Sequence, residues 1–177
     1  MEHNLDLGPD AQANHALALL RGLSFAGPIE PDGMLVPGIW FAFDPEAEMG
    51  GEVESTPGML LRARFRVVVP GRWMALHVAL GDIDLTNLHV LGFVCKSDAP
   101  EPVTFRASLR SATDSGFVDC FFPKRVVAFG ETSTHVDLLQ IGRSEPLPIR
   151  APWREMILFF DRKDFEITFR DLRLFIV

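Results

Sequence analysis

Tyrosine is absent from the 177 residues, although phenylalanine occurs 15 times and tryptophan three times. Without a phenol, no tyrosine can act as a catalytic acid, base or nucleophile, which excludes a lyase that depends on a tyrosine base. Cysteine is scarce as well. The two cysteines, Cys95 and Cys120, each lie inside an apolar run and cannot form a disulfide framework, so we expect two buried, reduced thiols.

Long hydrophobic runs and an excess of positive charge are also missing. No window approaches the ~18 continuous apolar residues of a membrane span. The opening MEHNLDLGPD has neither the basic nor the apolar segment of a signal peptide. We therefore expect a soluble protein with no membrane span, cytoplasmic unless the chain was trimmed from a secreted precursor. The net charge of −7 disfavours nucleic acid as a partner, because an acidic surface repels phosphates.

The beginning of the chain predicts a helix followed by a connector. Between Pro9 and Arg21, alanines and leucines recur at the spacing of one helix face, which predicts one helix of about 12 residues. Glycines and prolines between residues 24 and 37 predict an irregular connector. We expect residues 1–37 to pack as helix and connector on a single domain formed by residues 38–177.

From Gly38 onward the pattern changes to short strands. The clearest is MLLRARFRVVV (Met59–Val69), in which apolar residues alternate with three arginines, the period of a half-buried strand. Turn signals recur every ~8–12 residues, which predicts an all-β fold, an antiparallel sandwich or barrel, of which we expect the two-sheet sandwich. The expected strands are 38–43, 59–69, 73–80, 88–95, 103–110, 117–122, 126–129, 136–141, 154–160 and 165–177, with a turn at Pro123-Lys124.

Alternation also predicts the core. A slip of one residue would bury Arg62 and Arg64, so the inward face of each strand is fixed. The side chains expected between the sheets are Leu61, Phe65, Leu76, Val78, Phe93, Phe105, Leu158 and Phe169.

The order of these segments resembles a known group. GIWFAF, MLLRARFRVVV, WMALHVAL, the loop GDIDLTN and LHVLGFVCKS precede a late apolar strand, MILFF, and a closing DLRLFIV. This resembles the jelly-roll β-sandwich of carbohydrate-binding modules and galactose-binding-like domains, in which the last strand carries an Asp-aliphatic-Arg-aliphatic pattern, here Asp171–Leu174. The resemblance covers residues 38–177. It implies a non-catalytic domain that binds a saccharide or glycoconjugate.

Arginines form the most conspicuous candidate site. Strand residues two apart are separated by ~7 Å, a spacing that suits guanidinium groups arranged along an extended anionic or hydroxyl-rich ligand. The alternative is a solvated face whose arginines pair with acids such as Asp119, Glu155 or Asp161 on adjacent strands. The arginines concerned are Arg62, Arg64 and Arg66 on one strand and Arg106 and Arg110 on another.

Trp73 and His77 share one face of the next strand with Ala75 and Ala79. Small neighbours beside an aromatic ring can leave a shallow groove in which the ring stacks on a sugar. Alternatively, this face packs under the N-terminal helix and the alanines make room for it. The other two tryptophans, Trp40 and Trp153, are interpreted as core or rim residues.

Metal binding is limited to one loop. Asp82 and Asp84 lie two residues apart in GDID, where calcium would need several oxygen ligands. The alternative is a polar turn in which Asp84 caps the Thr86-Asn87 segment. The five histidines lack the H-x-H and H-x-x-x-H spacings, so we expect no transition metal and no other cofactor.

These features support three hypotheses. The first is a non-catalytic, carbohydrate-binding-module-like domain that recognises its ligand on one sheet face. The second is a protein–protein interaction domain of a multi-component system, using the same face. The third is a glycan-active enzyme with paired carboxylates, which form in space and not in sequence. The ligand-binding residues predicted for the first are Arg62, Arg64, Arg66, Trp73, His77, Arg106 and Arg110.

Overall fold

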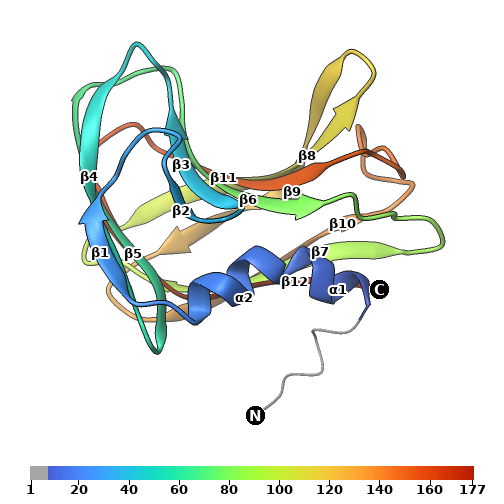
Figure 1. The fold of residues 1–177 in the computed structure, drawn as a ribbon, viewed down its shortest axis with the longest axis horizontal. Helices are drawn as coiled ribbons and strands as arrows, with labels where there is room; N and C mark the ends of the chain where they lie inside the picture. The colour runs from blue at the N-terminus through green and yellow to red at the C-terminus, as the bar shows by residue number, and fades with distance from the viewer. Residues whose placement is uncertain (1–7) are drawn as a thin grey trace.

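Two antiparallel sheets form most of the molecule. The computed structural model describes residues 8–177, within which the chain forms twelve strands and two short helices (Figure 1). The elements are α1 (Pro9–Ala13), α2 (His15–Arg21), β1 (Phe25–Pro28), β2 (Met34–Val36), β3 (Ile39–Phe43), β4 (Glu48–Thr56), β5 (Met59–Val69), β6 (Met74–Gly81), β7 (Val90–Asp98), β8 (Val103–Thr113), β9 (Gly116–Ala128), β10 (Ser133–Gln140), β11 (Arg154–Phe160) and β12 (Phe165–Ile176).

Each sheet has six strands. The first sheet has the order β1-β4-β5-β12-β7-β10, and the second has the order β2-β3-β6-β11-β8-β9. The predicted two-sheet sandwich is therefore confirmed. All eight side chains expected in the core are buried, and Cys95 and Cys120 are buried free thiols, as expected.

The predicted irregular connector was wrong, because it contains two strands. β1 pairs with β4 at the edge of the first sheet, and β2 pairs with β3 at the edge of the second. An edge strand needs partners on one side only, so it tolerates the glycine and proline that argued against strands here.

Strand β4 was not predicted either. Its sequence, EMGGEVEST, is acidic and contains two glycines, which are poor strand formers. Gly51 nevertheless fits because β4 passes very close to β5. A Cβ atom added at Gly51 would lie 2.0 Å from the carbonyl oxygen of Arg64. The residue that weakened the strand prediction is the one that allows this close pairing.

The turn predicted at Pro123-Lys124 was also wrong, since β9 continues through it. The pairing of β9 with β8 shifts register between Arg106 and Ser108, which indicates a β-bulge. Proline lacks an N–H group, but β9 is an edge strand. The Lys124 N–H leaves the ladder and donates to the Asp137 carboxylate at 2.8 Å.

The predicted single helix is divided into α1 and α2 at Asn14. The Asn14 amide is buried and donates to the carbonyls of Asp10 and Leu174, and its oxygen accepts from the Leu174 N–H at 2.9 Å. β12 pairs with β5 only as far as Phe169, so its later residues have a free edge. Asn14 covers that edge. Arg21 adds a hydrogen bond to the Leu172 carbonyl.

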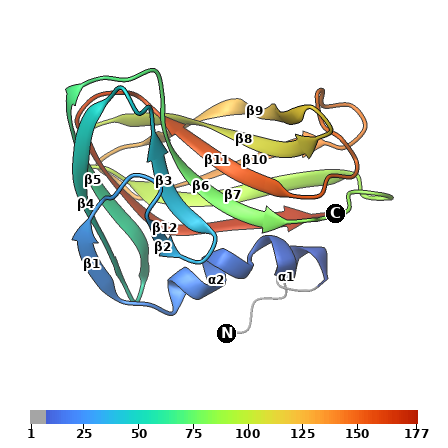
Figure 2. The same cartoon turned by 45° about the horizontal axis from the view of Figure 1, so that its top comes forward.

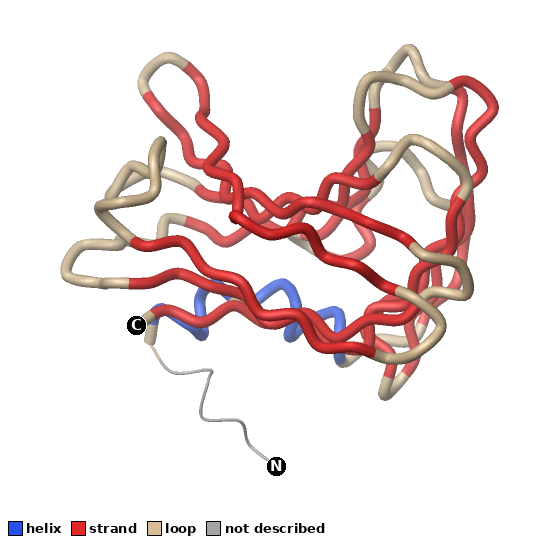
Figure 3. Tube along the Cα trace, turned by 180° about the vertical axis from the view of Figure 1, so that it is seen from behind, coloured by secondary structure: helices blue, strands red, loops and turns tan. Residues whose placement is uncertain are grey.

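The second sheet carries raised segments on its outer side. Figures 1 and 3 show the β8–β9 hairpin rising at one end, and the β3–β4 and β5–β6 connections rising at the other. In the tilted view of Figure 2, β3, β6, β11 and β8 run side by side across this outer face. The helices lie on a different side of the molecule, along β12.

Candidate functional site

A row of outward-facing residues crosses the second sheet from one edge region to the other. The strand register places each member directly beside the next on the neighbouring strand. Their sequence neighbours, such as Phe41, Leu76 and Leu158, point into the core. We call this set the aromatic row. Its members are Trp40, His77, Ile157, Ser108 and Phe121, in that order.

Aromatic rings stand at both ends of the aromatic row. The half-buried Trp40 stacks on His77, with ring centroids 4.9 Å apart and planes at 20°. Phe121 is 39% exposed and lies 5.8 Å from the ring of Phe159. The two ends are four strand spacings apart, which is ~19 Å at ~4.8 Å per strand. A ligand in contact with both ends would therefore be an extended molecule, longer than a single sugar.

The centre of the row contains polar groups. His77 is 7% exposed, and its Nδ1 atom lies 3.0 Å from Glu155 Oε2. An ionised carboxylate only accepts, so Nδ1 carries the proton of this hydrogen bond. Within residues 8–177, His77 Nε2 and Ser108 Oγ are buried without a hydrogen-bond partner. Unpaired groups of this kind cost ~1–3 kcal/mol each. Among the described residues, Ser97 Oγ and His135 Nε2 of the first sheet are unpaired in the same way, so it is the arrangement of the whole row that makes this face a candidate site.

Two arginines lie over phenylalanine rings at the β9 end of the row. Arg106 is centred 4.3 Å from the Phe121 ring, and Arg110 lies 3.8 Å from the Phe117 ring. Arg110 also forms a two-pronged ion pair with Asp119, with both hydrogen bonds at 2.8 Å. This cross-strand pairing with Asp119 agrees with the alternative interpretation of the arginines. Cation–π stacking and ion pairing fix the orientation of both guanidinium groups.

The arginine stripe of β5 lies on the other sheet. Arg62 pairs with Glu166 and with Glu54, and Arg64 pairs with Glu166 at 2.8 Å. The side-chain hydrogen bond between Arg62 and Glu166 is the main cause of two shifts. It lowers the pKa of Glu166 and raises the pKa of Arg62. Arg62, Arg64 and Glu54 line a pocket of about 750 Å³ beside β1 and β4. Arg66 is exposed on the same strand.

The seven predicted ligand residues therefore do not share one face. His77, Arg106 and Arg110 lie together on the outer side of the second sheet. The β5 arginines lie on the first sheet. Trp73 is half-buried just before β6 begins, where its carbonyl accepts from the Asp44 N–H at 3.0 Å. The alternation pattern could not separate these groups, because it does not specify which strands share a sheet.

Sequence reasoning missed several members of the site. Trp40 was interpreted as a core or rim residue, yet Ile39, Phe41 and Phe43 point inward, so alternation alone places Trp40 outward. Its position beside His77 could not be derived, because it requires β3 to pair with β6. Phe121 and Ser108 likewise enter the site only through the pairing of β8 with β9 and β11.

The connections at one end of the face are held together by Asp44. Its buried carboxylate accepts from the N–H and the Nε of Arg72, at 2.6 and 2.9 Å, and from the Glu46 N–H at 3.1 Å. The Arg72 side-chain hydrogen bond is the main cause that lowers the pKa of Asp44 to about 2. Asp44 therefore fixes the β5–β6 connection against the end of β3.

The candidate calcium loop is occupied by protein contacts. Asp84 accepts from the Thr86 N–H at 2.8 Å, as the capping interpretation expected, and pairs with Arg150 at 3.2 Å. Hydrogen bonds from the side chain and the N–H of Thr86 lower the pKa of Asp84. Asp82 accepts from Gln12 at 2.7 Å. In the part of the chain from residue 8 onward, no three His, Cys, Asp or Glu side chains group as metal ligands. Calcium at this loop stays a prediction.

Comparison with known proteins gives structural matches alone. No family model and no curated protein sequence matches the chain. The CBM22-1 xylan-binding domain from Paenibacillus barcinonensis is 9% identical, with a TM-score of 0.53 over 86% of this chain and 93% of that domain. A CBM4 module is 14% identical, with a TM-score of 0.54 over 85% and 95%.

A third match is the N-terminal cellulose-binding domain of a Cellulomonas fimi β-1,4-glucanase, 13% identical, with a TM-score of 0.51 over 84% and 95% of the two chains. This chain has the jelly-roll fold of carbohydrate-binding modules. At such low identities the likeness concerns the fold, not the ligand. Separately, no helix between residues 8 and 177 is long and apolar enough to cross a membrane.

Proposed function

We propose that this protein is a non-catalytic carbohydrate-binding domain that holds a saccharide across the strands of the second sheet. The observation that carries the proposal is the aromatic row, with Trp40 and Phe121 at its ends, and the row of charged side chains beside it, Glu155, Arg110 and Asp119. The fold supports it, since two proteins that share it are described as xylan-binding and cellulose-binding.

Each part of the face has a role in this proposal. The apolar faces of sugar rings stack on the indole of Trp40 and on Phe121. Hydroxyl groups between them hydrogen-bond to the charged side chains of the adjacent row, Glu155, Arg110 and Asp119. His77 Nε2 and Ser108 Oγ are covered by neighbouring side chains, so a hydroxyl reaches them only when a neighbour moves. The face binds without bond cleavage.

The decisive experiment measures binding to soluble xylan, β-glucan and other polysaccharides by affinity electrophoresis and calorimetry. Trp40→Ala and Phe121→Ala should each weaken binding by ~2 kcal/mol, roughly thirtyfold in Kd, as expected for aromatic anchors. Leu138→Ala is the matched control. It removes a side chain that is 38% exposed, close to the 39% of Phe121, but from the first sheet. Equal affinities for all four proteins would refute the site.

The protein-interaction alternative uses the same face and predicts a different result. Exposed Phe117 and Phe121 beside Arg110 would also suit a polypeptide, because aromatic and arginine side chains are enriched in protein interfaces. In that case no polysaccharide binds. A copurifying protein is then retained by the wild type and released by Phe121→Ala, while Leu138→Ala retains it.

A further inference from the structure

Two arginines face each other at the β9 side of the candidate face. Arg106 on β8 and Arg125 on β9 are direct cross-strand partners, and both are exposed. Like charges in this position repel each other. In the described part of the chain, neither of them forms an ion pair with a carboxylate. Among residues 8–177, neither charge is therefore neutralised by a paired carboxylate.

This arrangement differs from that of most arginines in the molecule. The chain has 24 acidic residues against 17 basic ones, so carboxylates are plentiful. Eight arginines between residues 8 and 177 pair with one, namely Arg21, Arg62, Arg64, Arg72, Arg110, Arg150, Arg170 and Arg173. In an acidic protein, two adjacent exposed arginines that lack such a partner form a local positive site.

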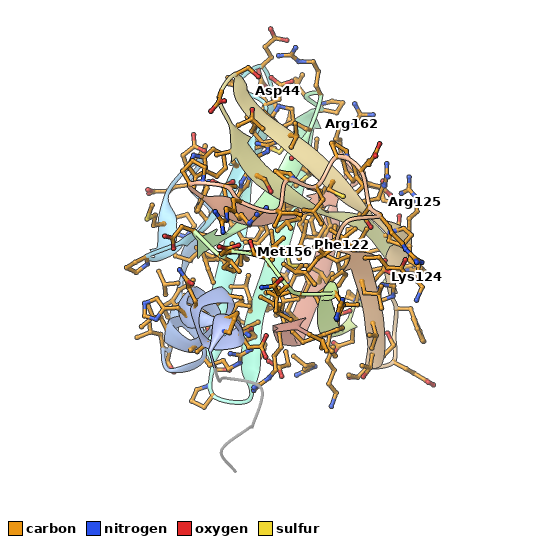
Figure 4. All side chains as sticks on the ribbon, turned by 90° about the vertical axis from the view of Figure 1, so that its right-hand side faces the viewer. Asp44, Phe122, Lys124, Arg125, Met156 and Arg162 are labelled. Atoms are coloured by element: carbon orange, nitrogen blue, oxygen red, sulfur yellow. The ribbon has the colours of Figure 1, made fainter. Side chains whose placement is uncertain are left out.

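Two acids near this part of the face accept hydrogen bonds from side chains other than Arg106 and Arg125. Asp119 is bound by both prongs of Arg110, and Asp161 accepts from the Thr104 hydroxyl at 3.0 Å. Lys124, next to Arg125, adds a third positive charge, and its ammonium donates to the Val136 carbonyl at 3.1 Å. Figure 4 shows Lys124 and Arg125 extending away from the edge of the sandwich, unlike Phe122 and Met156 in its interior.

The arginine pair adjoins the aromatic row. The guanidinium carbon of Arg106 lies 4.3 Å from the centre of the Phe121 ring. Phe159 on β11 is the direct cross-strand partner of Arg106. A ring stacked near Phe121 would therefore place its substituents beside Arg106 and Arg125. On the opposite side of the face, the neighbouring residues Trp40, Ala42 and Ala75 are uncharged, and a charged side chain near Trp40 is Glu155, which is hydrogen-bonded to His77. Arg106 and Arg125, which have no carboxylate partner among residues 8–177, therefore lie toward the β9 side of the face.

We propose that the saccharide held by this face carries an acidic group, a carboxylate or a sulfate, that Arg106 and Arg125 bind. This inference rests on the proposed function. Planar guanidinium forks match the two oxygens of a carboxylate or sulfate, and an anion between the arginines would relieve their repulsion. The ligand is then an acidic polysaccharide, with neutral rings toward Trp40 and the acidic group toward β9.

The test compares matched polymers. Polygalacturonate is measured against its fully methyl-esterified form, and dextran sulfate against dextran, so that each pair differs in charge. We expect the acidic member of one pair to bind at least tenfold more tightly than its neutral partner. A difference within the polygalacturonate pair would identify the acidic group as a carboxylate, and a difference within the dextran pair would identify it as a sulfate. Equal binding within both pairs would overturn the inference.

Variants separate a specific site from general charge attraction. Arg125→Ala and Arg106→Gln should each weaken binding of the acidic polymer about tenfold, the effect of losing one charge-assisted hydrogen bond. Arg66→Ala is the matched control, since it removes an exposed arginine from the first sheet. An equal loss with Arg66→Ala would refute the site. Thermal unfolding of each variant verifies that it is folded.

The two proposals fail in different ways. If Trp40→Ala abolishes binding of neutral and acidic polymers while the Arg106 and Arg125 variants bind normally, the carbohydrate-binding function stands and the acidic preference is wrong. If no polymer binds the wild type, or if Trp40→Ala has no effect on any polymer that binds, the carbohydrate face itself is wrong.

Discussion

At the scale of single residues, buried polar side chains determine the shape around the candidate face. Arg154 is 1% exposed and has no carboxylate partner among residues 8–177. It donates instead to the Ser111 hydroxyl and to the carbonyls of Ile83, Pro148 and Ile149. Burial lowers the pKa of Arg154, and these acceptors compensate for its desolvation. The Arg154 side chain thus connects the loop that contains Ile83 and the loop that contains Pro148 and Ile149 to the beginning of β11.

Asp44 gives a prediction about acid stability. The hydrogen bonds from Arg72 lower the pKa of Asp44 to about 2, from an ordinary value of 3.8. The folded protein therefore holds this carboxylate ionised where the unfolded chain would protonate it. Its contribution to stability is complete above pH 3.8 and is lost as the pH falls through 2.

Asp44→Asn should accordingly lower the urea midpoint at pH 6, and the difference from the wild type should shrink by pH 2. Asp82→Asn serves as the control. Its carboxylate accepts from Gln12, an uncharged side chain, so the substitution removes no ion pair. If the difference in urea midpoint between wild type and Asp44→Asn stays constant from pH 6 to pH 2, the pKa of Asp44 is not lowered by Arg72 and the prediction is wrong.

At the scale of elements, the sequence predicted strands whose alternation is strong and missed those whose pairing depends on neighbours. β5, β6 and β11 were predicted closely, since inward residues such as Phe65, Leu76 and Leu158 recur with a period of two. β1 and β4 contain glycine, proline or acidic residues, and β2 has only three residues. All three are strands because another strand fixes them. Local propensity cannot reveal that contribution.

The sequence also predicted only part of the candidate site. His77, Arg106 and Arg110 were selected from outward positions, and the structure brings them to one face. Trp40 could have been added by applying alternation to GIWFAF. The separation of the β5 arginines from that face, and the adjacency of Arg106 and Arg125, depend on strand order and on the β9 bulge, which are long-range features.

The division of the helix makes a second stability prediction. Asn14→Leu removes the hydrogen bonds to the Leu174 N–H and carbonyl and leaves that strand edge unpaired. We expect a loss of ~2–3 kcal/mol in the free energy of unfolding, measured in urea. The Leu174 amide should exchange its hydrogen faster. Gln12→Ala, on the exposed side of α1, should change stability by less than ~0.5 kcal/mol. Similar losses for both variants would contradict this role.

At the scale of the whole molecule, the two outer faces carry arginines in different electrostatic settings. On the first sheet, Arg62 and Arg64 share Glu166, and Arg62 also pairs with Glu54, which gives a balanced surface network. On the second sheet, Arg106 and Arg125 have no such partners among residues 8–177. We therefore interpret the first face as a solvated ion-pair network, and the proposed saccharide site is on the second.

This division predicts the behaviour of Arg64→Ala. The Arg64 side chain is 52% exposed, and exposed ion pairs contribute only ~0–1 kcal/mol to stability. The free energy of unfolding of the variant should therefore lie within ~1 kcal/mol of that of the wild type. Its Kd for any polysaccharide bound by the wild type should stay unchanged at low and high salt. A substantial loss of binding would instead place a ligand on the β5 stripe.

The contact between α1 and β12 has a topological consequence. The Ile176 N–H donates to the Asp10 carboxylate at 2.6 Å, so the two ends of the described chain meet on one side of the sandwich (Figure 1). A short linker could join them without disturbing either sheet, and the chain could then be reopened in the exposed β8–β9 hairpin. Such a circular permutant would carry its new termini beside Phe117. Fluorophores attached there would turn occupancy of the face into an optical signal.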